Sequence, residues 1–195
     1  MTDWNLLTPA QECLARLEII EAGPIWVNSA SQPPEAVLFL QDRAGGWISL
    51  SWDYQDVGPG FEIFCLDIGE PSAPGPADRA EYARLAPFAD IRLVLRTTWI
   101  RPASPGEVPP DYQQTIEASG RLSDVPANAT VAGVTLDGVV FLAPDGNPVM
   151  LISTENATTY RVLVKTDDAE IRAYVHECDA VSTQAFPAWA AQLRL

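Results

Sequence analysis

The sequence predicts an α+β fold built from two similar antiparallel β-meander units with covering helices. Short apolar runs separated by Gly and Pro turns predict antiparallel strands, because parallel crossovers would each need roughly a dozen residues or more. Amphipathic segments that flank these runs predict the helices. The same order of segments recurs roughly 100 residues later, which predicts the second unit.

The first unit begins with a helix expected over residues 9–22. Thr8 is placed to cap this helix, Pro9 suits its first position, and Gln11 completes a capping box. The segments that follow alternate apolar runs with turns. Strands are expected over residues 25–28, 36–40, 47–52 and 61–68, and a second helix over residues 78–85.

A long strand expected over residues 91–100 closes the first unit. Its period-two pattern places four large apolar side chains on one face: Ile91, Leu93, Leu95 and Trp99. Arg92, Arg96 and Thr98 fall largely on the other face. We therefore expect a strand with one side facing the core.

A proline-rich segment follows this strand. Residues 102–110 contain four prolines in nine residues, which cannot pack as a helix or as a central strand. We expect a linker here, between an N-terminal unit over residues 1–101 and a C-terminal unit over residues 111–195. The two units can also pack as one domain.

The second unit repeats the order of the first. A helix is expected over residues 110–119 and another over residues 168–178. Three pairs of segments between them correspond: 36–45 with 138–146, 47–51 with 149–153, and 61–65 with 160–164. An internal duplication explains this order, and coincidence between two ordinary meanders is the alternative.

The charge balance excludes several classes of partner. The 195-residue chain has 12 Lys and Arg against 26 Asp and Glu, a formal net charge of −14. Nucleic-acid binding needs basic side chains that displace counterions from phosphates, so we expect no nucleic-acid partner. An acidic membrane surface would repel the chain as well. Apolar residues make up 47% of the chain and charged residues 19%, so it can bury a core.

Cysteine usage and the N-terminus indicate the compartment. Cys13, Cys65 and Cys178 are odd in number and far apart, which favours buried thiols in a reducing compartment over a disulfide framework. No signal peptide and no membrane span are visible, so we expect a cytoplasmic protein. Eleven of the 12 basic residues are Arg, which is typical of a GC-rich bacterial genome.

Catalytic motifs are sparse. His176 is the only histidine, which excludes zinc sites with several histidines, and the helical pattern places it near the end of the helix over 168–178. There is no GxSxG or SxxK motif and no phosphate-binding glycine loop. Asp145 and Gly146 are typical of a hairpin turn, not of a calcium loop. We therefore expect no cofactor and no metal, and favour a non-enzymatic function.

Carboxylates are concentrated in one stretch. Between Arg43 and Arg79 there are six acidic residues and no basic one, a local charge of −6. Several stand beside aromatic residues in a segment expected to be an acidic loop over 52–62. Aromatic anchors surrounded by carboxylates suit a basic protein surface. The predicted partner-binding residues are Trp52, Asp53, Tyr54, Asp56, Phe61 and Glu62.

These observations predict a non-enzymatic, acidic bacterial protein that binds a basic partner protein, as an immunity-type inhibitor or a regulatory module. A carboxylate-dependent hydrolase, with two of the acids as general acid and base, is the first alternative. The same acids could instead hold Mg²⁺ or Ca²⁺, or simply be solvated. A structural or oligomerising protein, which would pair the strand over 91–100 with a copy of itself, is the other alternative.

Overall fold

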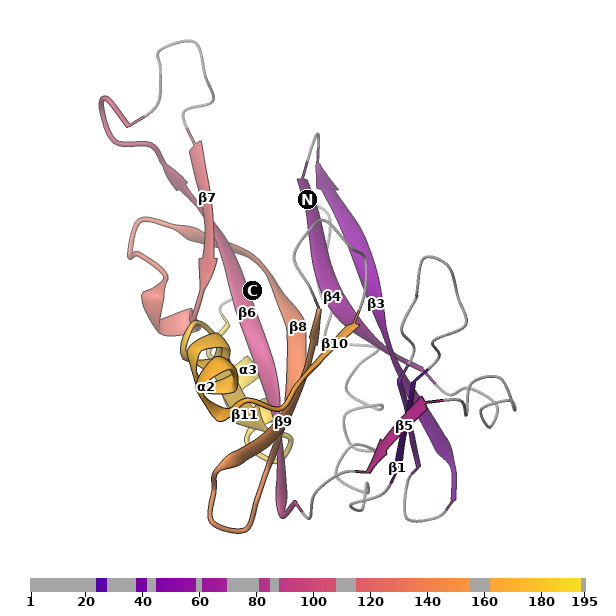
Figure 1. The fold of residues 1–195 in the computed structure, drawn as a ribbon. Helices are drawn as coiled ribbons and strands as arrows, with labels where there is room; N and C mark the ends of the chain where they lie inside the picture. Colours follow the sequence, from indigo (N-terminus) through magenta and orange to yellow (C-terminus); the bar gives the residue numbers. More distant parts are fainter. Residues whose placement is uncertain are drawn as a thin grey trace.

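A computed structural model describes residues 24–27, 38–41, 45–58, 61–69, 81–84, 88–107, 115–154 and 162–193. These segments form mostly antiparallel sheet with few helices, which confirms the α+β class (Figure 1). The helix expected over residues 9–22 lies outside the described residues.

The first sheet has the strand order β4-β3-β2-β1-β5, and every pair in it is antiparallel. Its strands are β1 (Pro24–Val27), β2 (Leu38–Gln41), β3 (Trp47–Gly58), β4 (Phe61–Gly69) and β5 (Glu81–Arg84). The long β3–β4 hairpin dominates this sheet (Figure 1).

The second sheet has the order β10-β9-β8-β6-β11, and β7 pairs with β6 beside β11. Its strands are β6 (Asp90–Pro102), β7 (Thr115–Gly120), β8 (Thr130–Leu142), β9 (Pro148–Thr154), β10 (Val162–Lys165) and β11 (Asp179–Ser182). A 3-10 turn (Leu122–Asp124) and two helices, α2 (Asp168–His176) and α3 (Phe186–Ala190), complete the described chain. The Pro-rich segment after β6 therefore leads into a strand that returns alongside β6.

Two expected helices are strands where the structure describes them, so those predictions are wrong. Within the helix expected over 78–85, residues 81–84 form β5 and pair with β1. Within the helix expected over 110–119, residues 115–119 belong to β7 and pair with β6. Short helices gain little stability on their own, and pairing with a neighbouring strand satisfies the same backbone groups. Pairing with a strand that is distant in the sequence therefore determines the secondary structure of both segments.

The strand β6 has neighbours on both sides. β8 pairs with it along residues 90–100, while β11 and then β7 pair with residues 92–95 and 97–102 on the other side. The edge that an oligomerising protein would need along this strand is therefore occupied. The predicted faces are confirmed in part, since Ile91, Leu93 and Leu95 lie in the main core and Arg96 lies on the side of α2. Trp99 is buried beside Gly120 and not in the main core, and the other face of the strand is buried as well, because Val94 packs in a second cluster.

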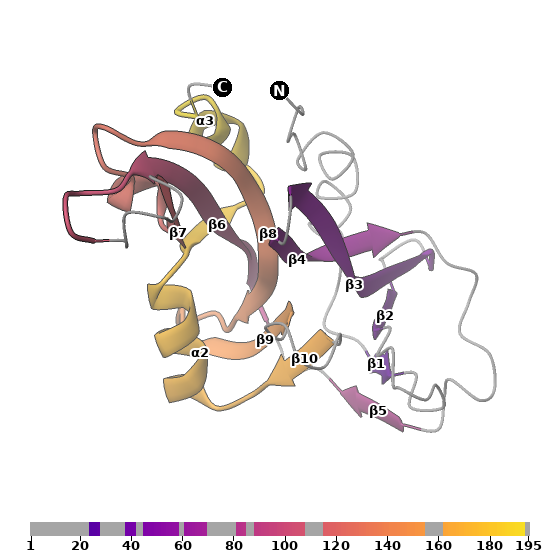
Figure 2. The same cartoon turned by 90° about the horizontal axis from the view of Figure 1, so that it is seen from above.

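The second sheet has a core on each face. The main core joins Ile48, Leu50 and Leu66 of the first sheet to side chains of β6, β8 and β9, and α3 adds Phe186. The other face packs beneath α2 through a smaller cluster of buried residues: Val94, Val140, Leu151, Ile171 and Cys178. Figure 2 shows α2 and the β3–β4 hairpin on opposite sides of β6 and β8. α2 therefore covers the face that the first sheet leaves open.

A β-bulge in β8 sets the register between the two cores. Val94 pairs with Gly138 and Leu95 with Leu136, so Asp137 is an extra residue on β8. The extra residue reverses the alternation along the strand. Even-numbered Val134 and Leu136 before it, and odd-numbered Val139 and Phe141 after it, consequently lie in the same main core.

Asp137 forms a buried ion pair with Arg96 of β6. Its side chain is 8% exposed, and Thr135 donates a hydrogen bond of 2.8 Å to its Oδ1. The Arg96 guanidinium lies 6.0 Å from the centre of the Tyr174 ring on α2. Burial alone would lower the pKa of Arg96, but the attraction and hydrogen bond of Asp137 raise it above its ordinary value. The pair thus connects β6, β8 and α2.

Removing one partner of this pair should destabilise the fold. We expect Asp137→Asn to lower the free energy of unfolding by about 3 kcal/mol, because it leaves the Arg96 charge buried without a counterion. Urea unfolding followed by circular dichroism measures the change. Asp67→Asn, which alters an exposed acid, serves as the control and should change the value by less than about 0.5 kcal/mol. Equal stability of the two variants would contradict the assigned role.

Candidate functional site

The six predicted partner-binding residues lie on the β3–β4 hairpin. The prediction of a loop over residues 52–62 is wrong, because β3 continues through Gly58 and β4 begins at Phe61. Trp52 pairs with Leu66, and Asp56 pairs with Glu62, with an irregularity before Gly58. Cross-strand pairing explains why acidic and aromatic residues in this stretch adopt extended structure. The predicted residues therefore occupy defined ladder positions.

Alternation along the hairpin divides the six residues into two sets. One set of alternate ladder positions holds Trp52, Tyr54, Asp56 and Glu62. It continues the positions of Ile48 and Leu50, which are 2% and 0% exposed in the main core. Asp53 and Phe61 take the other set of positions. The structure thus groups four of the predicted residues and separates two.

A second region of interest lies beside α2, where two neighbouring hollows open on the surface. The larger hollow has a volume of about 470 Å³, and the smaller one about 390 Å³. Both are lined by Arg121 and His176, whose side chains are in contact. Arg96, Asp124 and Glu177 belong to the smaller hollow.

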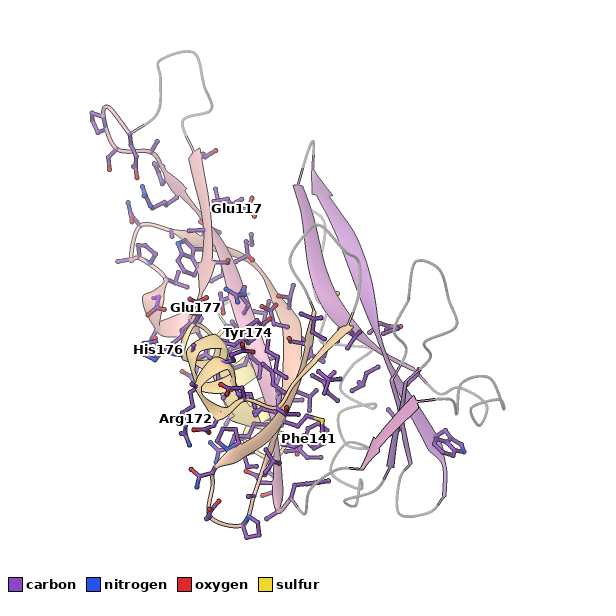
Figure 3. The ribbon with its side chains drawn as sticks, in the orientation of Figure 1. Glu117, Phe141, Arg172, Tyr174, His176 and Glu177 are labelled. Carbon is purple, nitrogen blue, oxygen red and sulfur yellow. The ribbon has the colours of Figure 1, made fainter. Side chains whose placement is uncertain are left out.

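The larger hollow has a cationic and an apolar part. Its charged or ionisable lining residues are Arg92, Arg121, Arg172 and His176, and no Asp or Glu is among the lining residues that the structure describes. Its larger apolar side chains come from β8 and α2: Val140, Leu142, Ile171 and Val175. Figure 3 shows Arg172 and His176 on the same side of α2, one turn apart. The hollow therefore combines a basic rim with an apolar lining.

Arg121 is held in place by the end of α2. Its Nε donates a hydrogen bond of 2.7 Å to the backbone carbonyl of His176, and its Nη2 donates to the same oxygen. Nη2 also lies 2.8 Å from Nδ1 of His176. A guanidinium can only donate, so Nδ1 is the acceptor in this contact. These bonds satisfy a carbonyl at the helix end that has no partner within the helix.

The other two arginines of the larger hollow are anchored by carboxylates outside it. Arg92 Nε lies 3.2 Å from Asp90 Oδ2, and Arg172 Nε lies 2.9 Å from Asp168 Oδ2. Arg172 Nη2 also donates to Oδ1 of Asn147 at 2.7 Å. Arg121 differs from both, because none of the described carboxylate side chains forms an ion pair with it.

Burial disfavours ionisation of two groups near the smaller hollow, the Cys178 thiol and the Tyr174 phenol. Burial raises the pKa of the Cys178 thiol to about 12, and the nearby Asp137 charge adds to the effect. Burial likewise raises the pKa of the Tyr174 phenol above its ordinary value. A thiol activated for nucleophilic attack needs a lowered pKa, whereas the pKa of Cys178 is raised. Its role is structural.

The sequence reasoning placed His176 well and missed the arginines around it. His176 is the last residue of α2 and is exposed, which confirms the expected position at the helix end. The arginines come from β6, the segment before the 3-10 turn, and α2, and only the fold brings them together. The spacing of Arg172 and His176, four residues apart on one helix, was the one local signal of a shared face.

The comparisons with known proteins leave the family open. No protein-family model, no curated protein and no solved structure matches the chain.

Among the described helices, none has the length and apolar character needed to cross a membrane. The described part of the chain brings together no group of three or more His, Cys, Asp or Glu side chains suited to a metal ion.

The raised pKa of Cys178 predicts a thiol that resists alkylation. At pH 8.5 it is almost fully protonated in the folded protein, because its pKa is about 12. We expect iodoacetamide to modify Cys178 at least about 100-fold more slowly in the folded chain than in urea, as read by peptide mass spectrometry. The same peptide in urea is the internal control. Similar rates in both states would show that the thiol is neither buried nor protonated as described.

Proposed function

We propose that the chain is a non-enzymatic acidic protein that binds a basic partner protein through the β3–β4 hairpin, as an immunity-type inhibitor or regulatory module. The observation that carries this proposal is the pairing of Asp56 with Glu62, directly opposite each other in the ladder. Like charges opposite each other destabilise a hairpin by roughly 0.2–1 kcal/mol. A basic partner would relieve that repulsion.

The surroundings of this pair favour the same function. It belongs to the stretch between Arg43 and Arg79 that has a local charge of −6 and no basic residue. Such a field speeds the encounter with a cationic surface and opposes an anionic one. The aromatic residues Trp52 and Tyr54, on the same set of ladder positions as Asp56 and Glu62, would supply the buried area that carboxylates alone do not provide, and Phe61 would add to it from the other set.

The place of the hairpin in the sheet also supports binding. β4 ends the strand order of the first sheet in the part of the chain that the structure describes. An edge strand offers backbone donors and acceptors to an added strand. The partner would then contact the hairpin through both its acids and its edge.

We also propose the finer organisation as part of this hypothesis. Two runs of consecutive antiparallel strands, β2-β3-β4 and β8-β9-β10, fall on the three pairs of similar segments, which supports an internal duplication of meander units. A cytoplasmic location agrees with the buried, unbridged thiol of Cys178.

Neutralising the hairpin should abolish partner binding. The triple variant Asp53→Asn, Asp56→Asn, Glu62→Gln should retain at least about tenfold less partner from a lysate of the source cells, because it removes the charges that attract a basic surface. Pull-down with quantitative mass spectrometry measures this. A matched control, Asp168→Asn, Glu170→Gln, Glu177→Gln, removes three exposed acids away from the hairpin and has the same net charge. Equal retention by the two triple variants, or no basic protein retained by the wild type, would refute the proposal.

The same hairpin should gain stability when its like-charge pair is removed. We expect Asp56→Asn to raise the free energy of unfolding by about 0.5 kcal/mol, since it ends the repulsion with Glu62. Urea unfolding at low ionic strength measures the gain, and added salt should reduce it. A loss of stability would mean that the two carboxylates do not repel each other in the free protein.

A further inference from the structure

We propose that the larger hollow beside α2 is a binding site for a small organic anion with an apolar body, such as an aryl carboxylate or aryl phosphate. The proposal joins two features of one cavity, a basic rim and an apolar lining. It is independent of the hairpin, which lies on the opposite side of the second sheet (Figure 2).

The charge of the lining contrasts with that of the whole chain. The protein has a net charge of −14, yet three of its 12 basic residues line this hollow, and no acidic residue is among the described lining residues. Asp90 and Asp168 offset part of the charge of Arg92 and Arg172 from outside the hollow. Within the described segments, the side chain of Arg121 has a carbonyl and an imidazole nitrogen as its partners and forms no ion pair, although Asp124 and Glu177 line the smaller hollow beside it.

The arginines also retain hydrogen-bond donors. Each is anchored through Nε, and Arg121 and Arg172 use Nη2 as well. Within the described residues, Nη1 of Arg121, Nη1 of Arg172 and both terminal nitrogens of Arg92 have no acceptor. Anchored guanidiniums with spare donors are suited to a carboxylate or phosphate group, because little side-chain freedom is lost on binding.

The apolar lining specifies the rest of the ligand. Leu142 of β8 and Val175 of α2 are partly buried and line the hollow, while Val140 and Ile171 form the buried cluster beneath them. Its volume of about 470 Å³ is typical of a site for a small organic molecule. An inorganic anion would fill only the rim, and a neutral hydrocarbon would leave the guanidinium donors unused. The site therefore fits a molecule with one anionic end and an aromatic or aliphatic body.

Titration of the full chain with four probes tests this assignment. Isothermal titration calorimetry would compare 1-naphthoate and 1-naphthyl phosphate with the neutral 1-naphthylmethanol and with inorganic phosphate. We expect at least one naphthyl anion to bind with a dissociation constant below about 1 mM, and at least about tenfold more tightly than either single-feature probe. The two anions distinguish a carboxylate site from a phosphate site. Equal binding of 1-naphthylmethanol, or binding of none of the probes, would overturn the proposal.

Variants locate the binding in the hollow. Arg121→Gln should weaken binding of the naphthyl anion at least about tenfold, because it removes a charged hydrogen-bond donor. Arg121 also caps α2, so the double variant Arg92→Gln, Arg172→Gln provides a test that leaves that cap intact. The double variant should weaken binding roughly tenfold, since its two guanidiniums are more exposed and each contributes less.

Arg101→Gln is the matched control for both variants. Arg101 pairs with Glu107 and does not line the hollow, so this substitution should leave the affinity unchanged. Thermal unfolding of each variant shows whether the fold is intact. Unchanged affinity in the folded double variant, or an equal loss in Arg101→Gln, would show that the anion binds elsewhere.

Discussion

The buried ion pair between Arg96 and Asp137 is the constraint on which the second sheet depends. Taking two charges out of water is costly, and the pair recovers that cost only with good geometry and further hydrogen bonds, here from Thr135. Asp137 can reach Arg96 because the bulge adds one residue to β8 at that point. A slip of one residue would turn the carboxylate towards the main core, where it would have no partner. The pair therefore favours the same register of β6 against β8 as the apolar side chains of the main core do.

The position of α2 follows from the same region. Tyr174 lies over the Arg96 guanidinium, and Cys178 packs in the cluster beneath the helix, so the C-terminal half of α2 is held against the sheet. The helix end then presents its last carbonyl to Arg121. The position of the helix thus forms the basic hollow. Apolar residues of β8 and α2 line it, and arginines from three parts of the chain surround it. The acidic hairpin lies on the opposite side of the sheet from this hollow (Figure 2).

Local signals in the sequence predicted those parts of the fold that local interactions decide. The stripe of Ile171 and Cys178 identified α2, and Asp145 with Gly146 identified the turn, where Gly146 has a φ of 82°. The segments at 81–84 and 115–119 were misassigned because their strand partners, β1 and β6, lie far away in sequence. For the candidate site, the acids of the hairpin were visible as a run, but their pairing required the register. No sequence pattern connects the arginines of the hollow, because they are far apart in the sequence and come together only in the folded protein.

The arrangement of β6 has a consequence for how the protein is made. Residues 92–95 lie between β8 and β11, and β11 includes residues 179–182, far from β6 in the sequence. A growing chain therefore exposes β6, with its apolar Leu93 and Leu95, long before the strand that covers one of its edges has been synthesised. Contacts of such long sequence separation close slowly. The second sheet is consequently a structure that can be completed only after β11 has been synthesised, and until then β6 is an apolar strand with one unpaired edge.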